Sequence, residues 1–120
     1  MREEFKASLL RIHFNGEDKC QGVPLQEAIL EASRLEEIMF AISYRAVEGY
    51  GESAEIHRPH LLGHDDQPIL ITIVDSESQM SKLIPILDEM LDTGLMAVSD
   101  VDVIRVQTGS QPDQTKPDGP

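Results

Sequence analysis

The hydrophobic positions along this chain change period several times, and each period predicts a different element. From Ala7 to Phe14 apolar and polar residues alternate, which is typical of a β-strand. One side of this stretch carries Leu10, Ile12 and Phe14, and the other side carries Leu9, Arg11 and His13. The turn-rich residues 15–22 then predict a connecting loop.

An amphipathic helix is predicted from Leu25 to Met39. Pro24 suits its first turn, where the missing N–H of proline removes a donor that would have no partner. Apolar residues recur at intervals of three and four, whereas charged residues fall on the remaining positions. The apolar stripe consists of Leu25, Ala28, Ile29, Ala32, Leu35 and Met39.

Two strands are predicted on either side of a long polar segment. Ile42–Glu48 is the first strand. Ile69–Val74 is nearly all apolar and β-branched, so we expect it to be buried on both faces in the middle of a sheet. The segment between them, residues 49–67, is much longer than the about two to five residues of an ordinary hairpin loop. Loops of such length tend to be functional, so we expect the protein to act through this one.

A second helix and a final strand complete the pattern. Asp75, Ser76 and Ser78 are candidate N-caps of the helix, and Gly94 is a natural C-terminal stop. Pro85 lies inside the helix and is expected to bend it without ending it. Residues 95–98 and 101–106 then predict one last strand or a strand pair.

The order strand, helix, strand, strand, helix, strand predicts an α+β domain with the ferredoxin-like βαββαβ fold. In that fold an antiparallel four-stranded sheet carries both helices on one face. Residues 1–106 would form the domain, and residues 107–120, which are polar and rich in Pro, Gly and Gln, predict a disordered tail. The strands are apolar on both faces, as at Ile73 and Val74. Two helices shelter only one face, so we expect copies of the chain to cover the other.

Composition and charge narrow the classes of partner. The 22 acidic and 10 basic residues give a net charge of −12, which disfavours binding to nucleic acid and to anionic membrane surfaces. The single cysteine, Cys20, excludes an internal disulfide and fits a reducing cytoplasm. No apolar run approaches the roughly 20 residues of a membrane span, and no signal-peptide pattern opens the sequence. We therefore expect a cytoplasmic protein without direct membrane insertion.

Three arginines lie in predicted strands and are candidate anion ligands: Arg11, Arg45 and Arg105. A charged side chain in a strand needs a partner, and a guanidinium binds a phosphate through two parallel hydrogen bonds. One or more of the three would reach a subunit boundary and hold such a group there. The alternative is that they pair with the abundant carboxylates, such as Glu48 or Asp102.

The segment Gly49-Tyr50-Gly51 is a candidate ligand contact. Glycine allows a ligand to approach the backbone closely, and a tyrosine ring can stack on a purine. The alternatives are an ordinary loop entry and a tyrosine that packs at a strand end.

A histidine cluster follows in the same loop, where HRPHLLGHDD contains His57, His60 and His64. Imidazoles and carboxylates are ligands for Zn, Ni or Cu, so these residues are candidate metal ligands. Pro59 and Gly63 interrupt any helix that would align them, and a solvated loop without metal is the alternative.

No pattern of a catalytic site is present in the sequence. It has no nucleophile elbow with a Ser-His-Asp order and no Walker loop, and Cys20 lacks an evident activating base. The carboxylates Asp88, Glu89 and Asp92 fit a solvated helix face. We therefore expect a protein that is not an enzyme.

Five segments together resemble the PII-like signalling proteins: LLRIHF, GVPLQEAIL, RAVEGYGESAEIH, ILITIVDSE and LIPILDEMLDTGLMAVSDVDVIRV. The resemblance covers roughly Ser8 to Val106 and is closest to a short branch of that superfamily catalogued as a domain of unknown function. It implies a ferredoxin-like homotrimer whose open sheet faces meet around a central axis. It also implies clefts between subunits that hold an adenine nucleotide (ATP, ADP or AMP), and a mobile loop, opened by residues 49–51, that contacts a partner.

The resemblance also implies a partner, and the chain departs from the related proteins in one motif. Relatives of this branch are often encoded beside fluoride-exporter-type membrane channels, which implies a membrane transporter or channel as partner. The long Gly/Lys-rich phosphate loop of the nitrogen-regulatory PII proteins is missing, so their sensing of ATP and 2-oxoglutarate is not implied.

The leading hypothesis is a non-enzymatic regulatory trimer that binds a small effector between subunits and acts on a partner through the 49–67 loop. The alternative is a divalent-metal-binding module that uses His57, His60 and His64. A nucleotide-processing enzyme is a third possibility, which product formation on incubation would reveal.

Overall fold

The computed structural model describes residues 2–46, 49–50, 56–57 and 67–106; of residues 49–50 and 56–57 it describes only the backbone. The elements in chain order are β1 (Arg2–Asn15), β2 (Lys19–Cys20), β3 (Val23–Pro24), α1 (Leu25–Leu35), β4 (Phe40–Arg45), β5 (Gly49–Tyr50), β6 (Ile56–His57), β7 (Pro68–Asp75), α2 (Glu77–Met90) and β8 (Leu95–Val106).

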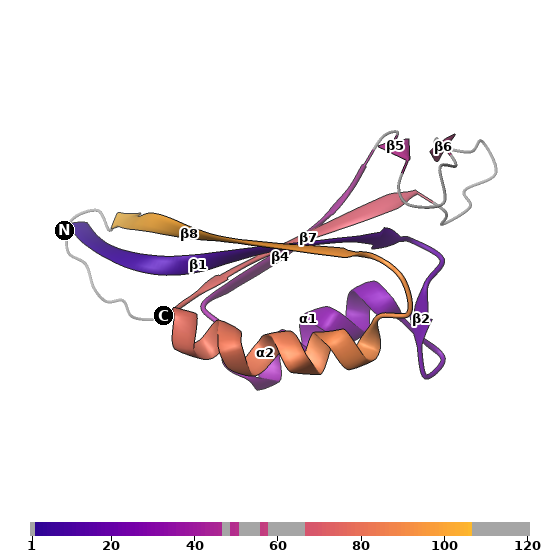
Figure 1. The fold of residues 1–120 in the computed structure, drawn as a ribbon, viewed down its shortest axis with the longest axis horizontal. Coiled ribbons are helices and arrows are strands. Elements are labelled where there is room, and N and C mark those ends of the chain that lie inside the picture. Colours follow the sequence, from indigo (N-terminus) through magenta and orange to yellow (C-terminus); the bar gives the residue numbers. More distant parts are fainter. Residues whose placement is uncertain (1, 47–48, 51–55, 58–66, 107–120) are drawn as a thin grey trace, which may run out of the picture.

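Four long strands form one antiparallel sheet in the order β4-β7-β1-β8, with α1 and α2 on the same face (Figure 1). This is the arrangement of the ferredoxin-like fold, so the predicted fold class is confirmed. The predicted position of residues 69–74 is also confirmed, because β7 lies between β4 and β1.

The core lies between the helices and one face of the sheet. Alternate residues of a strand point to opposite faces, and the register pairs Leu10 with Ile73, Ile12 with Ile71 and Phe14 with Ile69 on the helix-covered face. These residues pack with the apolar stripes of the two helices. The buried cluster consists of Leu10, Ile12, Phe14, Leu25, Ile29, Ile69, Ile71, Ile73, Met80, Leu83 and Leu87.

Helix α1 ends at Leu35, four residues before the predicted end at Met39. The backbone N–H of Glu37 donates to Arg34 O (3.0 Å), and that of Ile38 donates to Ser33 O (3.1 Å). This pair of bonds is the Schellman motif, in which the residue after the C-cap adopts a left-handed conformation. Glu37 occupies that position with φ 57°. The helix ends without the glycine that usually occupies this position. The apolar period, which continues to Met39, therefore predicted a longer helix.

Helix α2 begins at the N-cap Ser76, whose hydroxyl accepts a hydrogen bond from the Gln79 N–H at 3.1 Å. It continues through Pro85 to Met90, as predicted for a helix that survives its proline. The Gln79 side chain donates to Glu36 O at 2.9 Å and so joins the start of α2 to the end of α1. Asp75 accepts from the Met39 N–H at 2.8 Å, which fixes the entry of β4 against β7.

Strand β1 is longer than predicted and forms a two-stranded arm with β8. Strand β7 ends where Asp75 pairs with Ser8, whereas β1 continues back to Arg2 and pairs there with Val106. Residues 2–7 and 101–106, which we call the arm, therefore extend past the helices (Figure 1). Residues 95–106 form one continuous strand, so of the two predicted alternatives the single strand is correct.

The return from α2 to β8 passes over β1 at Gly94. The φ of this residue is +146°, and a Cβ built on it would lie 2.8 Å from His13 O. Glycine is therefore required here both by the backbone conformation and by the close approach of two chain segments.

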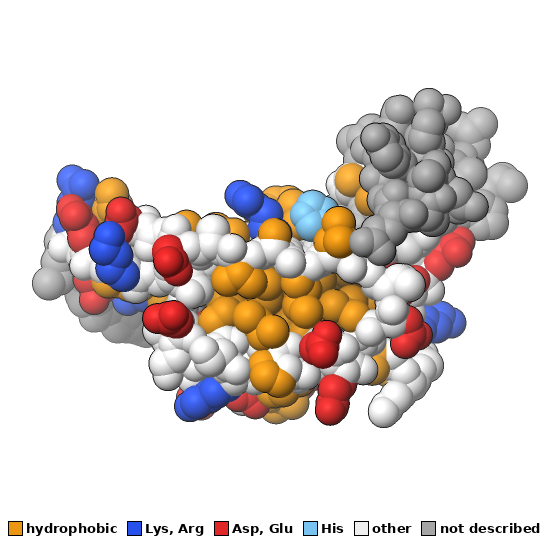
Figure 2. All heavy atoms as spheres, in the orientation of Figure 1, with side chains coloured by type: hydrophobic (Ala, Val, Ile, Leu, Met, Phe, Trp, Pro, Cys, Tyr) orange, Lys and Arg blue, Asp and Glu red, His pale blue; other side chains and the backbone are white. Residues whose placement is uncertain are grey.

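One lateral side of the core is not covered by a helix. Figure 2 shows hydrophobic side chains gathered in the middle of the view, between β8 and α2. Val98, which pairs with Leu10 on the helix-covered face, is 53% exposed, and Met96 and Ile84 are only partly buried against the core. The β8 edge of the sheet thus adjoins an exposed apolar surface.

Candidate functional site

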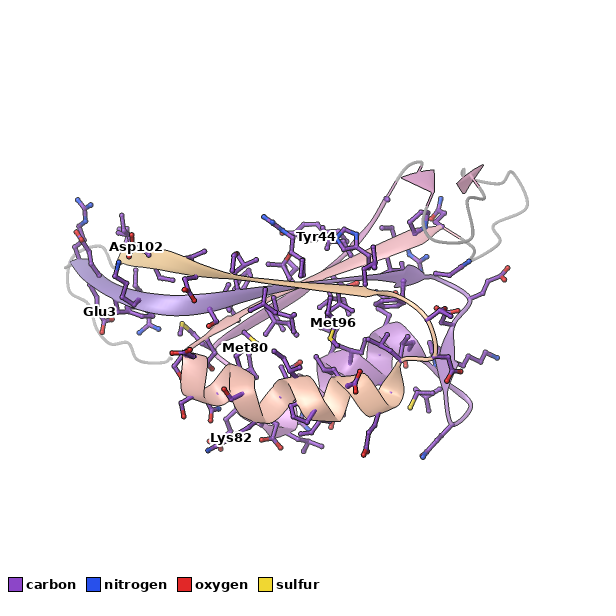
Figure 3. The ribbon with its side chains drawn as sticks, in the orientation of Figure 1. Glu3, Tyr44, Met80, Lys82, Met96 and Asp102 are labelled. Atoms are coloured by element: carbon purple, nitrogen blue, oxygen red, sulfur yellow. The ribbon has the colours of Figure 1, made fainter. Side chains whose placement is uncertain are left out.

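The sheet face opposite the helices, which we call the open face, is largely apolar and exposed. It is the uncovered face because both helices pack on the other one. Phe40 (45%), Ile42 (39%) and Tyr44 (49%) retain much of their exposed surface, and Figure 3 shows Tyr44 on the side of the sheet away from the helices, opposite to Met80 and Met96. We call the part of the sheet outside the arm the sheet body. The register between strands and the alternation along each strand give the residues of its open face. They are Leu9, Arg11 and His13 of β1, Leu70, Thr72 and Val74 of β7, Phe40, Ile42 and Tyr44 of β4, and Leu95, Ala97 and Ser99 of β8.

Arg11 and His13 are the basic side chains of the open face in the sheet body, and both are exposed. Arg11 lies opposite Thr72 on one neighbouring strand and Ala97 on the other, and His13 lies opposite Leu70 and Leu95. Strand β1 is an interior strand, so both residues lie near the middle of this face.

Arg105 is held on the arm by three contacts. Its Nη1 atom lies 3.2 Å from Glu3 Oε1, and its guanidinium carbon lies 5.5 Å from the centroid of the Phe5 ring. Its Nη2 atom lies 3.1 Å from Met39 Sδ, at the entry to β4. The side chain therefore links both strands of the arm to the sheet body.

Within one chain the structure does not bring the three candidate arginines together. Arg45 pairs with Ile69 and so lies toward the helix-covered face, at the end of the edge strand β4. Arg105 pairs with Glu3, eight residues along β1 from Arg11, which corresponds to about 27 Å in an extended strand. One anion held by more than one of them would need a second copy of the chain.

The predicted 49–67 loop contains a short two-stranded ribbon that the sequence pattern did not predict. Strands β5 and β6 pair antiparallel, with Gly49 opposite His57 and Tyr50 opposite Ile56. The backbone thus brings a candidate nucleotide-contacting residue next to a candidate metal ligand. Gly51, His60 and His64 lie outside the described residues. Among those that are described, no three His, Cys, Asp or Glu side chains gather to hold a metal ion.

The pKa shifts resolved for described residues belong to exposed ion pairs. A hydrogen bond to Asp102 raises the pKa of Lys6 on the arm. On α1, the hydrogen bond between Glu31 and Arg34 lowers the pKa of Glu31 and raises that of Arg34. All three groups are solvated, so these pairs are features of the surface rather than acids or bases held ready for a reaction. No helix in the described ranges has the length and apolar character needed to cross a membrane.

Comparison with known sequences places the chain in a family. Residues 7–103 match the family described as DUF190, uncharacterized ACR. The chain belongs to the DUF190 family. A UPF0166 protein of Aquifex aeolicus (strain VF5) is 29% identical over 102 residues, which cover 82% of this chain and 94% of that protein. A UPF0166 protein of Methanocaldococcus jannaschii is 27% identical over 104 residues, covering 86% and 96%.

Solved structures show that this DUF190 chain has the fold of PII-like proteins. CPII from Thiomonas intermedia K12, a nitrogen regulatory PII-like protein bound to ADP, AMP and bicarbonate, superposes with a TM-score of 0.61 at 19% identity, covering 84% of this chain and 91% of CPII. A putative PII-like signalling protein of Thermus thermophilus gives a TM-score of 0.59 at 15% identity with the same coverage. The divalent ion tolerance protein CutA1 of Ehrlichia chaffeensis gives 0.50 at 15%, covering 88% and 84%. The predicted PII-like fold and the predicted family of unknown function are thereby confirmed.

Proposed function

We propose that this DUF190 protein is a non-enzymatic, cytoplasmic PII-like regulator that works as a homotrimer. The observation that carries the proposal is the open face, a sheet face that no helix covers and on which large apolar side chains such as Phe40, Ile42 and Tyr44 are exposed. An apolar area of that extent is a poor surface for a lone soluble chain and a good one for contact between copies. The similarity of the fold to the PII-like proteins supports the same arrangement.

An adenine nucleotide is the effector that we propose, bound in clefts between subunits. Support comes from CPII, whose structures contain ADP and AMP. If the open faces meet in the middle, the sheet edges lie at the sides, where neighbouring subunits border each other. Arg45 and Arg105 belong to the edge strands β4 and β8, which supports a role for both at such a cleft. We propose both as ligands of the nucleotide phosphates, together with backbone or ring contacts from residues 49–51.

The 49–67 loop is the proposed contact to the regulated partner, for which we propose a membrane transporter or channel. Binding of the effector near Gly49 would favour one loop conformation over others and so change the affinity for that partner. The mechanism requires that the effector bind one loop conformation more tightly than the others, because equal affinity for all of them would leave their populations unchanged.

Calorimetric titration with ATP, ADP, AMP and cyclic AMP tests the nucleotide proposal. At least one nucleotide is expected to bind, and Arg45→Gln is expected to weaken that binding by roughly tenfold or more, since a charge-assisted bond is worth about 1.5–3 kcal/mol. Arg34→Gln is the matched control, because it removes an exposed arginine from helix α1. Absence of heat with all four nucleotides would refute the effector proposal.

A divalent-metal-binding module remains the second candidate. It is favoured by the pairing of His57 with Gly49, which places the first histidine of the cluster at the root of the loop, and by the fold of CutA1, a divalent ion tolerance protein. Metal analysis of untagged protein, before and after changing His57, His60 and His64 to Ala, distinguishes the two. A metal content that is unchanged in the triple variant would rule this candidate out.

A further inference from the structure

The open face contains an electrostatic imbalance that its own residues do not resolve. In the sheet body it carries Arg11 and His13 and, among the described residues, no carboxylate. The acidic residue of this face that the structure describes is Glu3, about 27 Å along β1 from Arg11 and already paired with Arg105. The surroundings of Arg11 are small or apolar, with Thr72 and Ala97 directly opposite.

Association through the open face, as in the proposed trimer, would take Arg11 out of water. An unpaired charge in an apolar interface is strongly unfavourable, so the guanidinium needs an anionic partner or the interface will not close. In the described sheet body the large acidic excess of the chain does not supply one, because its acidic residues lie on other surfaces.

Symmetry excludes the sheet body of a neighbouring open face as the source of the countercharge, and Glu3 on the arm is already paired with Arg105. When copies meet by the same face, each contributes the same residues, so every neighbour brings another Arg11 and His13 and no acid from the described sheet body. Association therefore multiplies the positive charge near the axis instead of neutralising it.

We propose that Arg11 and His13 of the associated copies form a binding site for one inorganic oxyanion, such as phosphate or sulfate, on the trimer axis. The proposal rests on the trimer of the proposed function, and the site is distinct from the nucleotide clefts at the sheet edges. Arg11 offers paired N–H donors that fit two oxygens of such an ion. His13 lies two residues away on the same face, about 7 Å along the strand, and its imidazole carries an N–H donor whether neutral or protonated. Thr72, opposite Arg11, adds a hydroxyl donor.

The site makes assembly dependent on the anion. A ligand that binds the trimer and not the separated chains stabilises the trimer in proportion to the logarithm of its concentration. The concentration of free phosphate would then set how much trimer is available to bind the effector.

Sedimentation velocity over a dilution series in phosphate tests the inference, with chloride added to hold ionic strength constant. For the unaltered chain, a hundredfold rise in phosphate above the dissociation constant of the site is expected to lower the protein concentration at which trimers dissociate by up to about tenfold, because one ion is bound for three chains. Calorimetry with phosphate alone is expected to show one ion for three chains, which separates an axial site from a site repeated in each subunit.

Arg11→Met keeps the length of the side chain and removes its charge, so trimers of this variant should form equally well with and without phosphate. Arg34→Met, on the helix surface, should respond to phosphate as the unaltered chain does. A phosphate response that persists in Arg11→Met, or trimers of the unaltered chain that are indifferent to phosphate, would overturn the axial site and leave the proposed regulator intact. Monomers at every phosphate concentration would overturn both, and the nucleotide titration would then show whether the effector proposal survives.

Discussion

Gly94 has less room for a side chain than Gly22, the other glycine with a positive φ among the described residues. Its φ of +146° is strained for any residue with a Cβ, and that Cβ would lie 2.8 Å from His13 O. We expect Gly94→Ala to lower the free energy of unfolding by about 1–3 kcal/mol. Urea denaturation at fixed protein concentration measures the change.

Gly22 provides the matched control for this measurement. It also has a positive φ, +83°, but a Cβ there would meet nothing within 4 Å. Gly22→Ala should therefore show backbone strain alone, and a larger loss of stability is expected for Gly94→Ala, where the contact with His13 O is added. Equal losses of stability would mean that β1 moves aside at Gly94.

Glu37 shows the opposite situation, in which a glycine is missing. A side chain at φ 57° costs about 1–2 kcal/mol in the left-handed region, and glycine adopts this conformation readily. We expect Glu37→Gly to raise the free energy of unfolding by roughly 0.5–1 kcal/mol, measured by thermal and urea denaturation. Glu36→Gly, at φ −85°, has no such strain to relieve and should bring no gain.

At the scale of elements, the start of α2 depends on one hydroxyl. Ser76 Oγ accepts from the Gln79 N–H, which otherwise has no partner in the first turn of the helix. Ser76→Ala is expected to lower the free energy of unfolding by about 1 kcal/mol. Ser81→Ala is the control, because Ser81 lies inside the same helix and its hydroxyl bonds only to Glu77 O. Equal effects of both changes would show that the cap contributes little.

Elements whose signals are local could be predicted from the sequence. The β-branched run of β7 and the continuation of α2 through Pro85 follow from side-chain chemistry within a few residues, as does the presence of a polar cap at the start of α2, for which Ser76 was one of three candidates. The end of α1 could not be predicted in this way, because Glu37 adopts a conformation that its residue type disfavours. The arm could not be predicted either, since Arg2, Glu3 and Glu4 are strand residues only through their pairing with β8.

The candidate site was less predictable than the fold. The sequence indicated the arginines but not their faces, which depend on strand register: Arg11 lies on the open face, and Arg45 lies on the other. The pairing of β5 with β6 rests on Gly49–Tyr50 and Ile56–His57, a pattern too short to stand out from a loop. The proposed ligand site, being shared between copies, would leave no periodic signal in one chain.

At the scale of the whole molecule, the open face should decide the state of association. Ile42, 39% exposed in the middle of β4, lies on it. We expect Ile42→Asp to convert the proposed trimer into folded monomers, because a carboxylate cannot be desolvated there without a partner. Sedimentation velocity measures the association, and circular dichroism checks the fold.

Leu35 supplies the control at an exposed apolar position on the helix side of the molecule, where it is 66% exposed. Leu35→Asp should leave the association unchanged. If both variants remained trimeric, copies would have to meet through some other surface, and the apolar area between β8 and α2 would be the next to test.

The arm also determines how the molecule responds to force. Arg2 lies opposite Val106 at the tip of the arm. Pulling these two residues apart therefore loads the backbone hydrogen bonds between β1 and β8 one pair after another. Pulling instead on Arg2 and Leu95, at opposite ends of the same two strands, loads all of those bonds together. In an optical trap the first attachment should peel the chain open at a much lower force than the second, and an unfolding motor that grips the chain beyond Val106 would meet the weaker direction first.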